Sequence, residues 1–393
     1  MAEGFHDDPH PHYAAWRSES PVLRMDRTPG GTPGWLITGY HEVRAALADP
    51  TLSKASGNVE EVLARYGSRP LITAPWLVQN MINSDPPDHT RLRRLAAAAF
   101  TPKAIDALRP RIEEITAHLL DGLARDGGVV DLMAGFAAPL PITVICEILG
   151  IAHDERGDFQ SWTRALIGHS PAEARAAASA SMVEFLSALV AAKRAAPGQD
   201  MLSALIQARD EGDALTEREL IATAFLLLVA GYETTVNLIG NGLNALFHHP
   251  GQLAALRADP SLIPGAVEEF LRFDGPVTQA SLRVTTEPVT YGGVEIPAGE
   301  VVQVSFLAAN RDPARFPSPD TLDIRRPAAG HVAFGHGIHY CLGAPLARME
   351  AEVAFTALLA RFPAFSRAPR DVPEWAPSDR LRGLRALWID LGT

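Results

Sequence analysis

The sequence predicts a mainly α-helical protein with small β-sheets, an α+β fold. Residues 102–194 alternate helical stretches rich in Ala, Leu and Glu with short breaks. Residues 216–248 keep an apolar helical period for roughly nine turns, which corresponds to about 48 Å at 1.5 Å per residue. Short segments with the alternation of strands lie near both ends of the chain.

The N-terminal part of the chain predicts two short strands and a helix. Val22–Met25 and Trp35–Tyr40 alternate as strands do, and His41–Asp49 has a helical pattern. Residues 53–83 contain two glycines and two prolines, and we expect a long irregular loop there.

The C-terminal part predicts a hairpin followed by coil. Residues 285–304 alternate around Gly292-Gly293, and a second turn signal, Pro297-Ala298-Gly299, follows. Residues 310–329 contain four prolines and no periodicity, so we expect an irregular connection before the next motif.

Composition excludes several classes of protein. At 393 residues, 47% hydrophobic and 21% charged, the chain can bury a large core. A formal charge of −11 argues against a nucleic-acid partner. The longest uninterrupted apolar run, residues 224–231, is too short to span a bilayer, and the polar N-terminus is unlike a signal peptide. Two cysteines argue against a disulfide framework, and the apolar surroundings of Cys146 predict core packing.

The most specific motif runs from Phe334 to Gly343 and brings Cys341 to the start of a predicted helix. A thiol at a helix N-terminus is stabilised as thiolate. Gly335 and Gly337 permit unusual backbone angles, and Gly343 leaves room for a flat ligand beside the chain. A buried structural cysteine is the alternative, but the full spacing favours an axial thiolate ligand for a haem iron.

This motif resembles the haem-binding signature of the cytochromes P-450, the haem-thiolate monooxygenases, in six positions: Phe334, Gly335, Gly337, His339, Cys341 and Gly343. Further family motifs extend from about Pro11 to Leu384. The resemblance implies the P-450 fold, with one domain over residues 1–393, a long central helix over the haem and a cysteine loop before a proximal helix. It also implies haem b, with Cys341 as the metal ligand.

The long helical segment contains a second motif. Thr216 to Glu219 has the pattern of a capping box. In the middle of the segment, Gly231 precedes Glu233 and Thr234, which predicts a locally widened helix like a π-bulge; a plain kink is the alternative. In the P-450 family such an acid–alcohol pair delivers protons to dioxygen, so the resemblance makes Glu233 and Thr234 catalytic candidates.

Cationic and hydrogen-bonding residues match the family positions that hold the haem propionates. His89 and Arg93 are spaced i and i+4 on a predicted helix, Arg283 begins a predicted strand, and His339 belongs to the cysteine loop. Three other arginines are interpreted as a docking patch for an electron donor: Arg91, Arg94 and Arg348.

The E-x-x-R pattern of the family is present as Glu269 and Arg272. In the family this pair is internal and is joined by another arginine. Threonine stands here where relatives often have that arginine, so Arg326 is the preferred third member and Arg325 the alternative.

The resemblance implies a substrate pocket lined by four segments: 53–82, 229–233, 276–282 and 378–381. Apolar members include Val277 and Trp76, and Arg380 stands where relatives often have an apolar residue; we expect it to point to solvent.

The implied activity is insertion of one oxygen atom from O2 into a C–H bond of a medium-to-large hydrophobic small molecule, by hydroxylation or epoxidation. Soluble bacterial P-450s that hydroxylate macrolides, other polyketides and steroid-like molecules are the most similar in pattern, so a secondary metabolite is expected as substrate. The electrons are expected from NAD(P)H through a separate ferredoxin, or flavodoxin, and its reductase.

The alternatives are a peroxide-driven haem peroxygenase or dehydratase and a non-catalytic haem-thiolate binding protein. The intact Glu233-Thr234 pair argues against the first. We further expect a cytoplasmic monomer with no membrane and no nucleic-acid partner.

Overall fold

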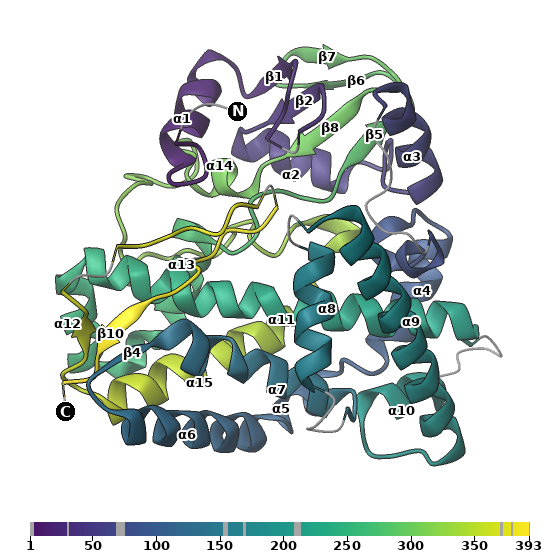
Figure 1. The fold of residues 1–393 in the computed structure, drawn as a ribbon. Helices are drawn as coiled ribbons and strands as arrows, with labels where there is room; N and C mark the ends of the chain where they lie inside the picture. Colours follow the sequence, from purple (N-terminus) through teal and green to yellow (C-terminus); the bar gives the residue numbers. More distant parts are fainter. Residues whose placement is uncertain are drawn as a thin grey trace. The chain divides into compact units, whose positions relative to one another are not determined.

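The computed structural model describes residues 4–29, 31–67, 75–151, 156–167, 170–207, 214–369, 372–378 and 380–392. These residues form two compact units. The first contains residues 1–52, 109–140 and 234–393, and the second contains residues 53–108 and 141–233. The predicted mainly α fold with small sheets is confirmed (Figure 1).

The first unit contains a mixed five-stranded sheet of strand order β1-β2-β8-β5-β3. β1 and β2 form an antiparallel hairpin, β2 pairs in parallel with β8, and β8 pairs antiparallel with β5. A hydrophobic cluster contains buried side chains of β2, α2 and β8, including Ile37, Val43 and Val304. The strands of this sheet are β1 Val22–Met25, β2 Gly34–Ile37, β3 Leu52–Ser53, β5 Arg283–Thr285 and β8 Val301–Val304.

Two smaller antiparallel sheets complete the strands of the first unit. One has the order β4-β10-β9, and the other is a hairpin of β6 and β7 that turns at Gly292 and Gly293, both with positive φ. The hairpin was predicted, whereas the β4–β10 pairing was not. Their bounds are β4 Val129–Asp131, β6 Val289–Tyr291, β7 Val294–Ile296, β9 Ser366–Arg367 and β10 Trp388–Asp390.

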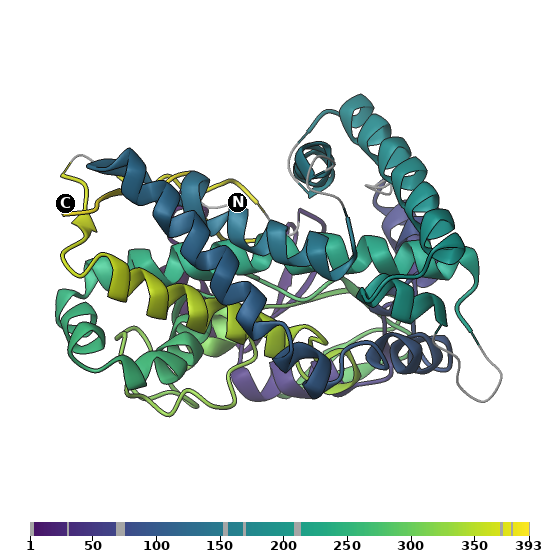
Figure 2. The ribbon, with the colours of Figure 1, turned by 90° about the horizontal axis from the view of Figure 1, so that it is seen from below.

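Helices of the first unit pack mainly against one another and against the five-stranded sheet. α15 lies along α6 and also contacts α13 (Figure 2). The helices are α1 His10–Glu19, α2 Tyr40–Ala48, α6 Arg109–Asp126, α12 Pro250–Ala258, α13 Ile263–Asp274, α14 Phe306–Asn310 and α15 Ala344–Arg361, with short 3₁₀ turns η5 Pro260–Leu262 and η6 Gly337–His339 and a π-helical turn η3 Met133–Ala137.

The second unit is helical, with α8 packed along α9 and α9 against α10 (Figure 1). The loop expected over residues 53–83 is wrong in part, because Ser56–Arg65 forms helix α3; residues 68–74 lie outside the described residues. Its other elements are η1 Pro75–Val78, η2 Met81–Asn83, α4 Asp88–Ala97, α5 Pro102–Asp106, α7 Pro139–Ile148, α8 Arg156–Ile167, α9 Ala172–Ala195 and α10 Met201–Gln207.

The helix α11, Glu217–His248, runs through both units as one continuous α-helix of 32 residues. Its predicted capping box is confirmed: the Thr216 amide donates to Glu219 at 2.8 Å, and the Glu219 amide donates to the Thr216 hydroxyl at 3.3 Å. α11 and α9 are long and apolar enough to cross a membrane, which is weak evidence for a span. In α11, 61% of the most apolar window is buried inside the protein, as in a core helix.

Candidate haem site

Cys341 stands at the end of a tight loop that its glycines make possible. Gly335 and Gly337 have φ values of +75° and +73°, a region that side-chain-bearing residues rarely adopt. The Cys341 amide donates to the Phe334 carbonyl at 2.9 Å, and the Tyr340 amide donates to the Gly337 carbonyl at 3.1 Å. The loop is therefore closed by its own backbone, and it leaves Cys341 exposed just before α15.

Side chains on the protein side of this loop hold it in place. Arg348 lies over the Phe334 ring at 4.6 Å and donates two hydrogen bonds to Glu268, at 2.6 and 3.0 Å. Burial would raise the pKa of Glu268, but hydrogen bonds from His331 and Arg348 outweigh it and lower the pKa to about 2. Glu268 therefore stays ionised and anchors the loop to α13.

The loop and Arg283 meet at the C-terminal end of α2. A Cβ at Gly337 would lie 2.9 Å from the Leu47 carbonyl oxygen, so only glycine permits this approach. The buried Arg283 guanidinium donates to the carbonyl of Ala46, the residue before Leu47, at 3.4 Å. Two of the predicted propionate ligands, Arg283 and His339, are thus held around one helix end, with Cys341 two residues beyond His339.

The other two predicted propionate ligands lie in the second unit, on α4. His89 is buried and Arg93, one turn later, is half-buried. Burial lowers the pKa of His89, and the charges of Arg93 and Lys54 lower it further. Lys54 is itself buried and was missed in the sequence because it lies in the segment expected to be irregular. An imidazole that stays neutral near two cations suits hydrogen bonding to an anionic group.

Glu233 and Thr234 are consecutive residues of α11, and both are half-buried. Successive residues of an α-helix point about 100° apart, so the acid and the alcohol occupy adjacent faces. The next residue, Thr235, is only 3% exposed and belongs to the packed side of the helix.

The widening predicted at Gly231 is not found, because α11 is α-helical throughout. Gly231 has a packing role instead: a Cβ there would lie 3.2 Å from Cδ1 of Ile145 on α7. Within the described residues, the π-helical turn of this protein is Met133–Ala137. Gly231 is therefore explained by the close contact between α11 and α7. Such a contact favours glycine in the sequence, as a local bulge would.

Glu269 and Arg272 form the predicted internal pair on α13, and neither side chain is exposed. Arg272 donates to both carboxylate oxygens of Glu269, at 2.7 and 2.8 Å. Arg326 adds a third bond at 3.3 Å, which confirms it over Arg325 as the third member.

The three arginines predicted as a docking patch are in different environments. Arg348 is committed to Glu268, and Arg91 pairs with Glu219 of the capping box. The side chain of Arg94 is exposed on α4. Two of the three guanidinium groups are thus engaged in holding the fold, which weakens their assignment to a docking surface.

Two of the four segments predicted to line the substrate pocket are neighbours within the first unit. Val277 and Leu381 form an antiparallel bridge, and the Thr278 amide donates to the Arg380 carbonyl at 2.9 Å. The side chain of Arg380 is exposed, as expected.

The residues of this loop suit a haem. The thiol is exposed, and Gly343 would meet no atom closer than 4.0 Å with a Cβ added, so a flat ring has space beside the chain.

Comparison with known proteins decides the family. The sequence pattern of "Cytochrome P450" matches residues 159–263 and 261–376. The chain belongs to the cytochrome P450 family. Cytochrome P450 107B1 of Saccharopolyspora erythraea is 52% identical over 99% of this chain and 96% of its own length. The 6-deoxyerythronolide B hydroxylase of the same organism is 44% identical over 99% of this chain and 98% of its own length.

The similarity extends to solved structures of P450s. The tirandamycin C-bound P450 monooxygenase TamI matches with a TM-score of 0.91 and 50% identity, over 100% of this chain and 99% of TamI. The protein is accordingly a P450 monooxygenase, which uses haem, dioxygen, a small-molecule substrate and redox partners.

Proposed function

We propose that this P450 inserts one oxygen atom from dioxygen into a C–H bond of a medium-to-large hydrophobic secondary metabolite such as a polyketide or macrolide. The observation that carries the reaction class is the exposed Cys341 thiol on its glycine-hinged loop before α15. The relatives named as a 6-deoxyerythronolide B hydroxylase and as tirandamycin C-bound TamI support the substrate class.

In this proposal each site residue has one task. Cys341 would be the one protein ligand to the iron, and its thiolate is favoured by the N-terminus of α15. Arg283, His339, His89 and Arg93 would hold the propionates. When bound, the haem supplies the redox chemistry that activates dioxygen.

Glu233 and Thr234 move protons. Glu233, half-buried on α11, takes protons from solvent, and the Thr234 hydroxyl passes them on and holds the acceptor oxygen by hydrogen bonding. Their adjacent faces on the helix let one group reach solvent while the other faces the reaction site. We propose NAD(P)H as the electron source, through ferredoxin or flavodoxin and a reductase, and a monomeric cytoplasmic enzyme.

A panel of hydrophobic ligands, screened for the low-to-high spin shift of the haem spectrum, tests the substrate class. Hydroxylation of a shifting ligand with NADPH, a surrogate ferredoxin and its reductase then tests the activity. Turnover with peroxide but none with the ferredoxin system would favour a peroxygenase. Ligand binding without turnover in either system would favour a non-catalytic protein. Either outcome would refute the proposed reaction.

A further inference from the structure

Arg382 lies where four segments of the first unit meet. Its amide donates to the Pro276 carbonyl at 2.9 Å, directly beside the bridge between Val277 and Leu381. Arg382 is thus the first residue after the segment 378–381, and it continues the pairing of that segment with Pro276. It does not itself belong to either predicted pocket segment, and its side chain is buried.

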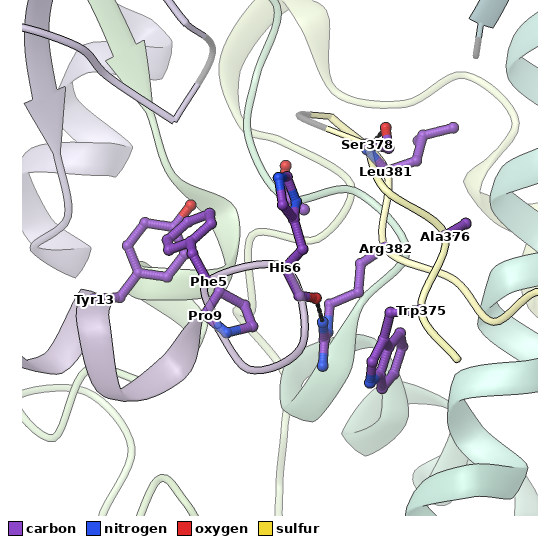
Figure 3. A pocket seen from close by; sticks show the side chains of 10 residues that line it. Phe5, His6, Pro9, Tyr13, Trp375, Ala376, Ser378, Leu381 and Arg382 are labelled. Atoms are coloured by element: carbon purple, nitrogen blue, oxygen red, sulfur yellow. Dashed lines mark hydrogen bonds between the residues drawn. The ribbon is translucent and has the colours of Figure 1, made fainter. Parts of the chain in front are cut away.

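The Arg382 side chain leads away from this pairing to the N-terminal turn. Its Nε donates to Asp274 at 2.6 Å, and its two terminal nitrogens donate to the carbonyls of His6 and Asp7 at 3.1 and 3.2 Å. The guanidinium also lies 3.5 Å from the centre of the Trp375 ring. Figure 3 shows Arg382 reaching from the C-terminal segment to the turn at His6, with Trp375 beside it.

The carbonyl of Arg382 is held by the helix that carries Thr234. Asn241 of α11 donates through Nδ2 to Arg382 at 2.9 Å and to the Asp274 carbonyl at 3.0 Å. A Cβ at Gly383 would lie 1.9 Å from Oδ1 of Asn237, so the chain touches the helix there. Asn237 and Asn241 are three and seven residues after Thr234, on the same face of the helix.

The contact between Arg382 and Asp274 is buried and charged, and it leaves no room for a further ligand. The cavity beside it, lined by Phe5, Tyr13, Trp375 and Arg382 among others, measures about 20 Å3, room for about one water molecule. Burial would raise the pKa of Asp274, but Arg382 and the hydrogen bond from His10 outweigh it and hold the pKa far below its usual value. Asp274 therefore remains an anion, bound to Arg382.

A buried, hydrogen-bonded ion pair specifies one geometry, because sliding by a residue would leave both charges unpaired. An apolar contact would tolerate such a shift at small cost. The charges thus fix the register of Arg382, and with it the register of the chain on both sides.

We propose that Arg382 is a positioning residue for substrate recognition, which fixes the segments 276–282 and 378–381 against the N-terminal turn and the Thr234 face of α11. The N-terminal turn, His6 to His10, thereby determines the affinity for substrate through Arg382. The proposal rests on the proposed function, because that function assigns these two segments to the substrate pocket.

The test compares Arg382→Gln with Arg382→Lys and with Lys193→Gln. Lysine keeps a charge for Asp274 but cannot also hold two carbonyls and stack on Trp375. Lys193 forms a comparable, mostly buried ion pair with Asp200 at 2.6 Å, in the unit that contains neither segment. Lys193→Gln therefore reproduces the loss of a buried ion pair without touching either of these two segments.

Three quantities are measured for each variant: the melting temperature, the hydrogen-exchange rate of the Thr278 amide, and the Kd of a spin-shifting ligand. At equal loss of melting temperature, we expect Arg382→Gln to raise Thr278 exchange about tenfold relative to Lys193→Gln. We also expect its ligand Kd to rise about fivefold or more, with Arg382→Lys between Arg382→Gln and wild type in both quantities. The carbon monoxide spectrum of the reduced protein should stay that of wild type.

Equal exchange rates and equal Kd values in Arg382→Gln and Lys193→Gln would overturn the proposal. Failure of both Arg382 variants to fold would also overturn it, because Arg382 would then be needed for folding and not for the positioning of the two segments. If wild type lacks the thiolate spectrum or binds no ligand of the panel, the proposed function fails instead. The exchange comparison needs no haem and still shows whether Arg382 holds the two segments.

Discussion

Replacing Arg272 by alanine should be among the most destabilising single changes in this protein. Its guanidinium is fully buried and makes five hydrogen bonds, two to Glu269 and one each to the carbonyls of Asn310, Pro319 and Thr321. Removing one partner of a buried ion pair costs about 3–5 kcal/mol. The unbonded carbonyls cost about 1–3 kcal/mol each where water cannot reach them.

The expected loss is therefore about 5 kcal/mol or more, which approaches the whole stability of a typical domain. Arg326→Ala is the matched control, because Arg326 makes one 3.3 Å bond to the same carboxylate and its three other bonds, to the carbonyls of Pro317, Ser318 and Thr321, are exposed to water. Glu269 then keeps both bonds from Arg272, so the loss should be about 1–2 kcal/mol.

Urea unfolding followed by tryptophan fluorescence measures both changes, and the yield of haem-loaded protein gives a second reading. Arg272→Ala should give little soluble haem protein, whereas Arg326→Ala should be obtained in useful amounts. An Arg272→Ala protein within about 1 kcal/mol of wild type would show that the pair and its carbonyls are hydrated, and the reasoning from burial would be wrong.

Three further outcomes are expected. Cys341→His should abolish the red-shifted Soret band of the reduced carbon monoxide complex, whereas Cys146→Ser should keep it; loss of the band in Cys146→Ser would contradict the ligand assignment. Thr234→Ala should keep NADPH oxidation but lower the product formed per NADPH, whereas Thr235→Ala, on the packed side of α11, should change this ratio much less. A wild-type ratio of product to NADPH in Thr234→Ala would remove Thr234 from the catalytic residues. Burial and the charge of Arg311 lower the pKa of His10 below 6.5 in the folded protein. The unfolded chain therefore binds more protons near and below that pH, and the free energy of unfolding falls as the pH falls from about 7. His10→Gln should flatten this part of the stability profile, and an unchanged profile would show that His10 does not contribute.

Local chemistry made part of this fold predictable. The β1 and β2 strands, the Gly292-Gly293 hairpin and the capping box at Thr216 each depend on residues that are close in the sequence. The third member of the Glu269 cluster was predicted from the family resemblance, which expects an arginine in the coil after Asn310, with Arg326 preferred over Arg325.

Long-range contacts produced the features that the sequence did not predict. Strands β4 and β10 are three residues each, too short to show alternation, and they are defined by each other. Gly231 looked like a site of helix widening because the sequence does not contain the position of Ile145. Arg382 had no local motif, since its partners come from the N-terminal turn and from α13. The roles assigned to the haem-site residues remain predictions.

The parallel pairing of β2 with β8 has a consequence for the synthesis of the chain. The partner of Trp35, Leu36 and Ile37 is made about 270 residues after them. At 5–20 residues per second the β1–β2 hairpin waits roughly 15 s to a minute for that partner. During this time one edge of the hairpin, with its apolar side chains, is open to other strands and to chaperones. The nascent chain is thus exposed to aggregation through this edge until residue 304 leaves the ribosome, and chaperone-assisted expression should raise the yield of folded enzyme.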